Sequence, residues 1–152
     1  MLKSVFFGAG MLLLALPACA QEAAPAQDAA PAVQAPPFSP VVVANGTIFL
    51  AGHLGRLPGT SDYPAGGIGE ETRQTLENIG ATLATVNASH ADLVRCQVFL
   101  ADIADFAEMN AAYRKFFPAN PPARTTVAVA GLAANASIEI ECTGIVGHSA
   151  DG

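Results

Sequence analysis

The sequence predicts an α+β fold in which two helices cover one face of a single β-sheet. Asn45-Gly46 lies between two short apolar runs, which is the strongest short-range signal for a β-hairpin. Two later segments repeat apolar residues at three- and four-residue steps, as amphipathic helices do. In residues 137–143, two isoleucines and a cysteine alternate with polar residues, which indicates a half-buried strand. Strands and helices that share one core give this fold class.

The first half of the domain is expected to form a hairpin and then a helix. Residues 41–44 and 47–51 flank the Asn-Gly turn. Gly55 to Gly69 contains two prolines and predicts an irregular connection. The first helix begins near Glu70, whose charge suits the positive N-terminal end, and Asn87 is its expected C-terminal stop.

The second half is expected to form a strand over 93–100, a helix over about 105–117 and a second hairpin from strands 125–130 and 137–143. Leu93 and Phe99 are expected on the face of the sheet away from the helices. A partly apolar open face predicts burial against other subunits.

Composition limits the classes of function. A chain of 152 residues is expected to form about one domain. Hydrophobic residues make up 51% of it and charged residues 13%, as in a globular protein. The formal net charge of −6 argues against nucleic acid as a partner, because phosphates require a basic surface.

The N-terminus predicts export. Residues 1–20 combine Lys3, an apolar stretch and a small-residue cleavage site, as a signal peptide does. Leu16-Pro17-Ala18-Cys19 also resembles a bacterial lipobox, so either the leader is cut after Ala20 or Cys19 carries lipid. A true N-terminal anchor is the weaker interpretation, because the apolar run is shorter than the roughly 20 residues of a membrane span. A periplasmic protein, free or held to a membrane by lipid, is expected.

Three further segments are predicted. Residues 21–37 consist almost wholly of Ala, Pro and Gln and are expected to be a linker, because they cannot bury enough apolar area to order themselves. The folded domain is expected over 38–147, and residues 148–152 are expected to be a disordered tail.

Several common site chemistries have no support in the sequence. Cys96 and Cys142 lie mid-strand on apolar faces, and buried free thiols are expected there in preference to a disulfide or a nucleophile. The three histidines lack metal-ligand spacing, and no metal site is predicted. No serine stands in a nucleophile elbow. The glycines of 66–69 are expected to form a flexible loop in preference to a phosphate site.

Arg124 and Glu139 remain as candidates. If the second hairpin brings them together, the arginine could bind a carboxylate with two prongs and the glutamate could activate a water. The same two residues could equally form a structural ion pair. The residues by themselves favour the ion pair.

The chain also resembles the reactive intermediate deaminase family, called Rid or YjgF. The resemblance covers nearly all of residues 38–146 and rests on six ordered segments: Phe49-Leu50-Ala51-Gly52-His53, Thr72-Arg73-Gln74-Thr75-Leu76-Glu77-Asn78, Val98-Phe99-Leu100-Ala101-Asp102, Met109-Asn110-Ala111-Ala112-Tyr113, Pro122-Ala123-Arg124-Thr125-Thr126-Val127 and Ile138-Glu139-Ile140-Glu141. It implies the chorismate-mutase-like fold, with a mixed sheet and two helices on one side. It also implies a homotrimer whose sheets line a central barrel, with three clefts between subunits.

The resemblance implies a hydrolase that acts without a cofactor on small 2-enamine and 2-imine acids and releases 2-oxo acids and ammonia. By similarity, Arg124 would bind the substrate carboxylate and Glu139 would position the attacking water. The backbone at Gly52 and Thr126 would line the site, with Asn110 nearby.

The sequence departs from the family at the site. Phe38 stands where the family often has tyrosine, Ala51 where serine is usual, and Thr126 where cysteine is common. Each lost hydroxyl removes a hydrogen bond that contributes about 1 kcal/mol. Because the sequence retains both Arg124 and Glu139, the favoured function is nevertheless an exported imine deaminase. The alternative is a non-catalytic trimeric module that binds small carboxylates, and a chaperone-like surface role is a weaker third option.

Overall fold

The computed structural model describes residues 37–148. The predicted leader, the Cys19 lipidation site, almost all of the linker and residues 149–152 lie outside these residues. Within the described range, no helix is long and apolar enough to cross a membrane.

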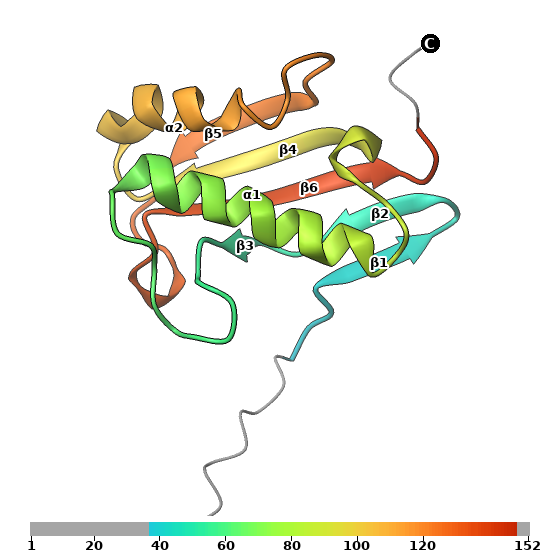
Figure 1. Ribbon diagram of the computed structural model, residues 1–152, viewed down its shortest axis with the longest axis horizontal. Coiled ribbons are helices and arrows are strands. Elements are labelled where there is room, and N and C mark those ends of the chain that lie inside the picture. The colour runs from blue at the N-terminus through green and yellow to red at the C-terminus, as the bar shows by residue number, and fades with distance from the viewer. Residues whose placement is uncertain (1–36, 149–152) are drawn as a thin grey trace, which may run out of the picture. The chain divides into compact units, whose positions relative to one another are not determined.

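The domain is built on a six-stranded mixed sheet (Figure 1). Its strands run in the order β1-β2-β6-β4-β5, and β3 pairs with β6 beside β2. The only parallel pair among these is β4 with β5. The strands are β1 Val41–Ala44, β2 Thr47–Leu50, β3 His53–Leu54, β4 Leu93–Leu100, β5 Ala123–Ala128 and β6 Ile138–Ile145.

Two helices cover one face of this sheet, as the sequence predicts (Figure 1). They are α1 Ile68–Ala84 and α2 Phe106–Tyr113. Short 3-10 turns occur at His90–Asp92, Ile103–Asp105 and Ala133–Asn135. Asn87, the predicted stop of the first helix, has a φ of 56°, a left-handed conformation that ends helices. The predicted Asn45-Gly46 turn is confirmed, and both residues have positive φ, as a tight hairpin turn requires.

The predicted second hairpin is wrong. Residues 123–128 and 138–145 both form strands, but β5 pairs in parallel with β4 at the sheet edge. β6 lies between β2 and β4 and is antiparallel to both. The physical reason is the helix between β4 and β5: a chain that crosses over through a helix returns parallel to the strand it left.

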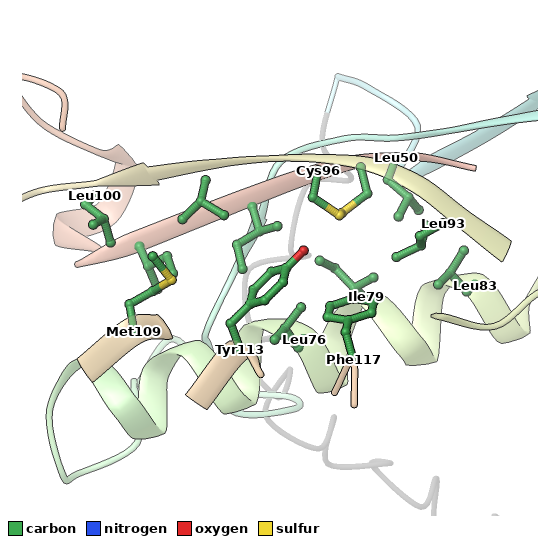
Figure 2. Packing of buried hydrophobic residues seen from close by; sticks show 14 of the residues in the cluster. Leu50, Leu76, Ile79, Leu83, Leu93, Cys96, Leu100, Met109, Tyr113 and Phe117 are labelled. Atoms are coloured by element: carbon green, nitrogen blue, oxygen red, sulfur yellow. A yellow bond between two sulfur atoms is a disulfide. The ribbon is translucent and has the colours of Figure 1, made fainter. Parts of the chain in front are cut away.

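The core lies between the helices and the sheet (Figure 2). Leu76, Ile79 and Leu83 of α1 are fully buried, and each contributes about 1.5–3 kcal/mol by leaving water. Leu93 was expected on the open face but is only 4% exposed within the core. A register shift between Leu93 and Arg95 turns Leu93 to the helix side, because an irregular residue changes the alternation of a strand.

The prediction of free thiols is also wrong. Cys96 and Cys142 form a disulfide with an S–S distance of 2.07 Å. They are direct partners in the antiparallel pair of β4 and β6, and their Cα atoms are 4.1 Å apart. This cross-strand register brings both sulfurs to the helix side, where both residues are buried.

Candidate active site

Arg124 extends from the sheet edge toward the helices. It is the register partner of Cys96 and therefore shares the helix-covered face with that residue. The Arg124 guanidinium carbon lies 4.5 Å from the centroid of the Tyr113 ring, a cation–π arrangement. Nη2 donates a hydrogen bond to Asn110 Oδ1. Residues from α2 thus hold the half-buried guanidinium in one orientation.

Asn110 and Thr126 belong to the same part of the molecule. Thr126 follows Arg124 by two residues and pairs with Val98, so it faces the helices as well. Its Oγ1 is buried and lacks a hydrogen-bond partner among the described residues. Arg124, Asn110 and Thr126 form the first group of site residues, which we call the arginine group.

Tyr113 belongs to one of the family-like segments of the sequence, but it was not predicted as a neighbour of Arg124. Its ring packs in the core with the hydroxyl end toward the sheet (Figure 2), and that hydroxyl lacks a partner among the described residues. Burial raises the pKa of Tyr113 to about 12, and the positive charge of Arg124 opposes part of this rise. The contact depends on the parallel pairing of β5 with β4, and the predicted hairpin placed β5 elsewhere; the strand–helix–strand order of residues 93–128 was the signal that could have found it.

Glu139 extends from the opposite face of the sheet. Its partner on β4 is Phe99, whereas the partner of Arg124 is Cys96. Cys96 and Phe99 are three residues apart on β4, so their side chains lie on opposite faces of the sheet. Arg124 and Glu139, which share the faces of these partners, therefore also lie on opposite faces. The Glu139 carboxylate lies against the backbone of Gly52, where an added Cβ would stand 1.8 Å from Oε1. Any residue other than glycine at position 52 would therefore collide with the Glu139 carboxylate.

Phe38, Ala51 and Gly52 come together around a hollow of about 400 Å³. Phe38 is 59% exposed at its rim. The Ala51 N–H donates to the Pro40 carbonyl at 3.0 Å, which ties the segment before β1 to the segment after β2. With Glu139 beside Gly52, these residues form the second group, which we call the glutamate group.

His53 links the glutamate group to α1 through hydrogen bonds of both ring nitrogens. Its Nδ1 lies 2.7 Å from the Ala51 carbonyl oxygen, and its Nε2 lies 2.8 Å from Thr82 Oγ1 on α1. A carbonyl oxygen only accepts, so Nδ1 carries the proton and the neutral ring can accept from Thr82 at Nε2. Burial lowers the pKa of His53, which favours this neutral form.

The predicted juxtaposition of Arg124 and Glu139 does not occur within one chain, and neither does the alternative ion pair. The ion pairs among residues 37–148 are those of Arg73 with Glu70 and Glu77. The arginine group can bind a carboxylate, and the Glu139 carboxylate can accept a proton from water. One copy of the chain does not bring both to one small ligand. No cluster of metal-ligating side chains occurs in the described part of the chain.

Comparison with known proteins identifies the family. Residues 27–146 match the family model described as Endoribonuclease L-PSP. The chain belongs to this family, also known as Rid or YjgF. The resemblance in the sequence is thereby confirmed, and so is the mixed α+β fold.

Several named Rid proteins are similar to the chain. The Reactive Intermediate Deaminase A, chloroplastic, of Arabidopsis thaliana is 42% identical over 106 residues, which are 70% of this chain and 57% of that protein. The 2-iminobutanoate/2-iminopropanoate deaminase of Homo sapiens is 37% identical over 111 residues, which are 73% of this chain and 81% of that protein. The solved structure of yeast Mmf1 is 34% identical, with a TM-score of 0.70 and coverage of 74% of this chain and 89% of that one.

Proposed function

We propose that this Rid protein is a cofactor-independent deaminase that hydrolyses small 2-imine and 2-enamine acids to 2-oxo acids and ammonia. The observation that carries the proposal is the Arg124 guanidinium, which Asn110 and Tyr113 hold in a fixed orientation at the sheet edge. Relatives named as 2-iminobutanoate/2-iminopropanoate deaminases support the reaction class. The net charge of −6 disfavours RNA, the substrate that the family's description as an endoribonuclease implies, because phosphates require a basic surface.

The proposed mechanism assigns one role to each charged residue. Arg124 binds the substrate carboxylate and places C2 of the imine. The Glu139 carboxylate accepts a proton from a water, whose oxygen then forms a bond to C2. The proton passes to the imine nitrogen. In the resulting tetrahedral carbinolamine the hydroxyl proton moves to the nitrogen as the C–N bond breaks, which gives the 2-oxo acid and ammonia.

The geometry supports a site between two subunits. Since Arg124 and Glu139 leave opposite faces of the sheet, one ligand can contact both groups if they come from different chains. The open face also carries exposed apolar side chains that a second copy would cover; they include Val42, Phe49 and Val127. We therefore place the site in a homotrimer, where three such clefts form.

A binding module is the second candidate. Phe38 and Ala51 present no hydroxyl to the hollow that they line, so two potential hydrogen bonds to a substrate or water are absent. Such a protein would keep carboxylate binding at Arg124 without efficient turnover.

We also propose that the domain is exported. The buried Cys96–Cys142 disulfide supports this location, because disulfides persist in oxidising compartments. Titration of free thiols in the natively folded protein, taken from cells without added reductant, checks the proposal. We expect no reactive thiol from either cysteine until the protein is denatured and reduced. Two thiols in the denatured, unreduced protein would contradict it.

Imine-trapping kinetics test the deaminase. An amino-acid oxidase generates 2-iminobutanoate while an amine trap competes for it, and the full-length protein diverts the imine to 2-oxobutanoate. We expect Arg124→Ala and Glu139→Gln each to lower kcat/KM by about 100-fold or more, the scale of a charged contact or a general base. Glu141→Gln is the matched control. Glu141 lies on the same face of β6 as Glu139, and its carboxylate already accepts a hydrogen bond from Gln97. If wild type diverts no imine yet binds 2-oxobutanoate through Arg124, the binding module is correct.

A further inference from the structure

The hollow of the glutamate group has mostly apolar walls and one cationic side chain. Phe38, Pro40, Leu54 and Ala133 supply much of the apolar surface, and Arg56 supplies the charge. A pocket of this kind holds the carbon chain of a ligand along its walls, while its few polar groups decide orientation and specificity. A ligand in this hollow is therefore oriented by those polar groups that have no partner within the protein.

Most polar side chains around the hollow are already occupied. His53 contacts the Ala51 carbonyl and Thr82 through its two ring nitrogens. Asn78 Nδ2 donates to the carbonyls of Leu54 and Arg56, each at 2.9 Å, and Asn78 Oδ1 accepts from Gln74 at 3.0 Å. These groups fix the walls and offer little to a ligand.

Arg56 is different. Its Nε is buried and lacks a hydrogen-bond partner among residues 37–148. No carboxylate of the described chain forms an ion pair with its guanidinium, since the recorded ion pairs are those of Arg73. A buried donor without a partner is unfavourable, and such a group in a native fold calls for a missing acceptor. Guanidinium groups bind carboxylates with two prongs.

The backbone holds Arg56 in place. Asn78 fixes its carbonyl, and the preceding Gly55 packs so closely on α1 that an added Cβ would stand 2.5 Å from the Glu71 carbonyl oxygen. The backbone of Arg56 thus belongs to a rigid segment that lines the hollow, which lowers the backbone entropy lost when a ligand binds.

We propose that Arg56 binds a second carboxylate of the ligand, so that the preferred substrates are acidic 2-imino acids with a carboxylate at the far end of their side chain. This inference rests on the proposed function, because it takes the hollow lined by Gly52, the residue against which the Glu139 carboxylate lies, as the place of the substrate side chain. Arg56 is then a specificity-determining residue that contacts the substrate away from the reacting atoms.

Calorimetric binding to the full-length protein tests the proposal. The probes are 2-oxoglutarate and its 5-methyl ester, which differ in the charge of the terminal group. We expect wild type to bind the acid about ten- to a hundredfold more tightly, as a charged hydrogen bond provides. Arg56→Met should remove this preference and retain affinity for the ester. Arg56→Lys should keep part of it.

Each outcome decides the matter. Equal affinities in wild type, or a preference that survives in Arg56→Met, would overturn the assignment. If Arg56→Met binds neither probe, Arg56→Lys decides: a retained preference supports the role of the charge, and a lost one contradicts it. Turnover of 2-iminobutanoate by wild type is a separate readout, because that substrate has no second carboxylate. If wild type does not turn over 2-iminobutanoate, the proposed deaminase function is contradicted, whereas the binding measurements still decide the role of Arg56.

Discussion

At the scale of single residues, Tyr113 links the core to the candidate site. Its ring lies under the Arg124 guanidinium and also contacts Phe117, with ring centroids 4.8 Å apart. The ring fixes the cation, whereas the buried hydroxyl has no partner in the described structure. The aromatic ring and the hydroxyl therefore affect stability in opposite directions.

Alkaline unfolding should report on this hydroxyl. The pKa of Tyr113 is about 12 in the fold, against about 10 in an unfolded chain. Below pH 10 both states keep the proton, and the full stability is present. As pH rises from about 10 to 12, the unfolded state loses the proton first, so the free energy of unfolding falls, by at most about 3 kcal/mol.

Tyr113→Phe removes this titration. We expect the variant to be at least as stable as wild type at pH 7 and to lose less stability between pH 10 and 12, measured by urea unfolding at a series of pH values. Tyr63→Phe is the matched control, since Tyr63 is only half-buried and its hydroxyl donates to the Ala134 carbonyl in an exposed hydrogen bond; this variant should follow the wild-type pH dependence. An unchanged alkaline loss in Tyr113→Phe would contradict the burial of a neutral phenol.

At the scale of elements, β4 organises the sheet. It pairs with β5 on one side and β6 on the other, and its alternate residues face the core. The disulfide joins β4 to β6 across 46 residues of sequence. Closing a loop of that length lowers the entropy of the unfolded chain and is expected to stabilise the fold by about 4 kcal/mol. The bond therefore stabilises β6, the strand that carries Glu139 and pairs with β3, which begins directly after Gly52.

At the scale of the whole molecule, the separation of Arg124 and Glu139 has a direct consequence. If the site lies between subunits, Arg124→Ala and Glu139→Gln chains can complement each other, because a mixed interface receives Arg124 from one chain and Glu139 from its neighbour. Random mixing at equal amounts gives a complete site at about one interface in four.

Co-expression of the two variants with different tags measures this effect. Oligomers that carry both tags should regain a substantial part of the wild-type rate of imine hydrolysis, and each variant alone should not. A mixed oligomer as inactive as its parents would place both residues of a site in one chain and contradict the proposed interface.

The sequence by itself determined the fold class, the first hairpin, both helices and the candidate residues. Those features follow from local patterns: the Asn45-Gly46 turn, the apolar period of α1 and the alternation in β6. The family motifs also identified Arg124, Glu139 and Gly52.

The tertiary structure alone decided how the later strands pair and which residues meet. The parallel pairing of β5, the Cys96–Cys142 register and the contact of Tyr113 with Arg124 depend on segments distant in sequence, for which local periodicity carries no information. The same applies to the opposite faces of Arg124 and Glu139. The alternation of side chains shows which residues of one strand share a face. Only the pairing register between strands shows whether residues of two strands, such as Arg124 on β5 and Glu139 on β6, lie on the same face of the sheet.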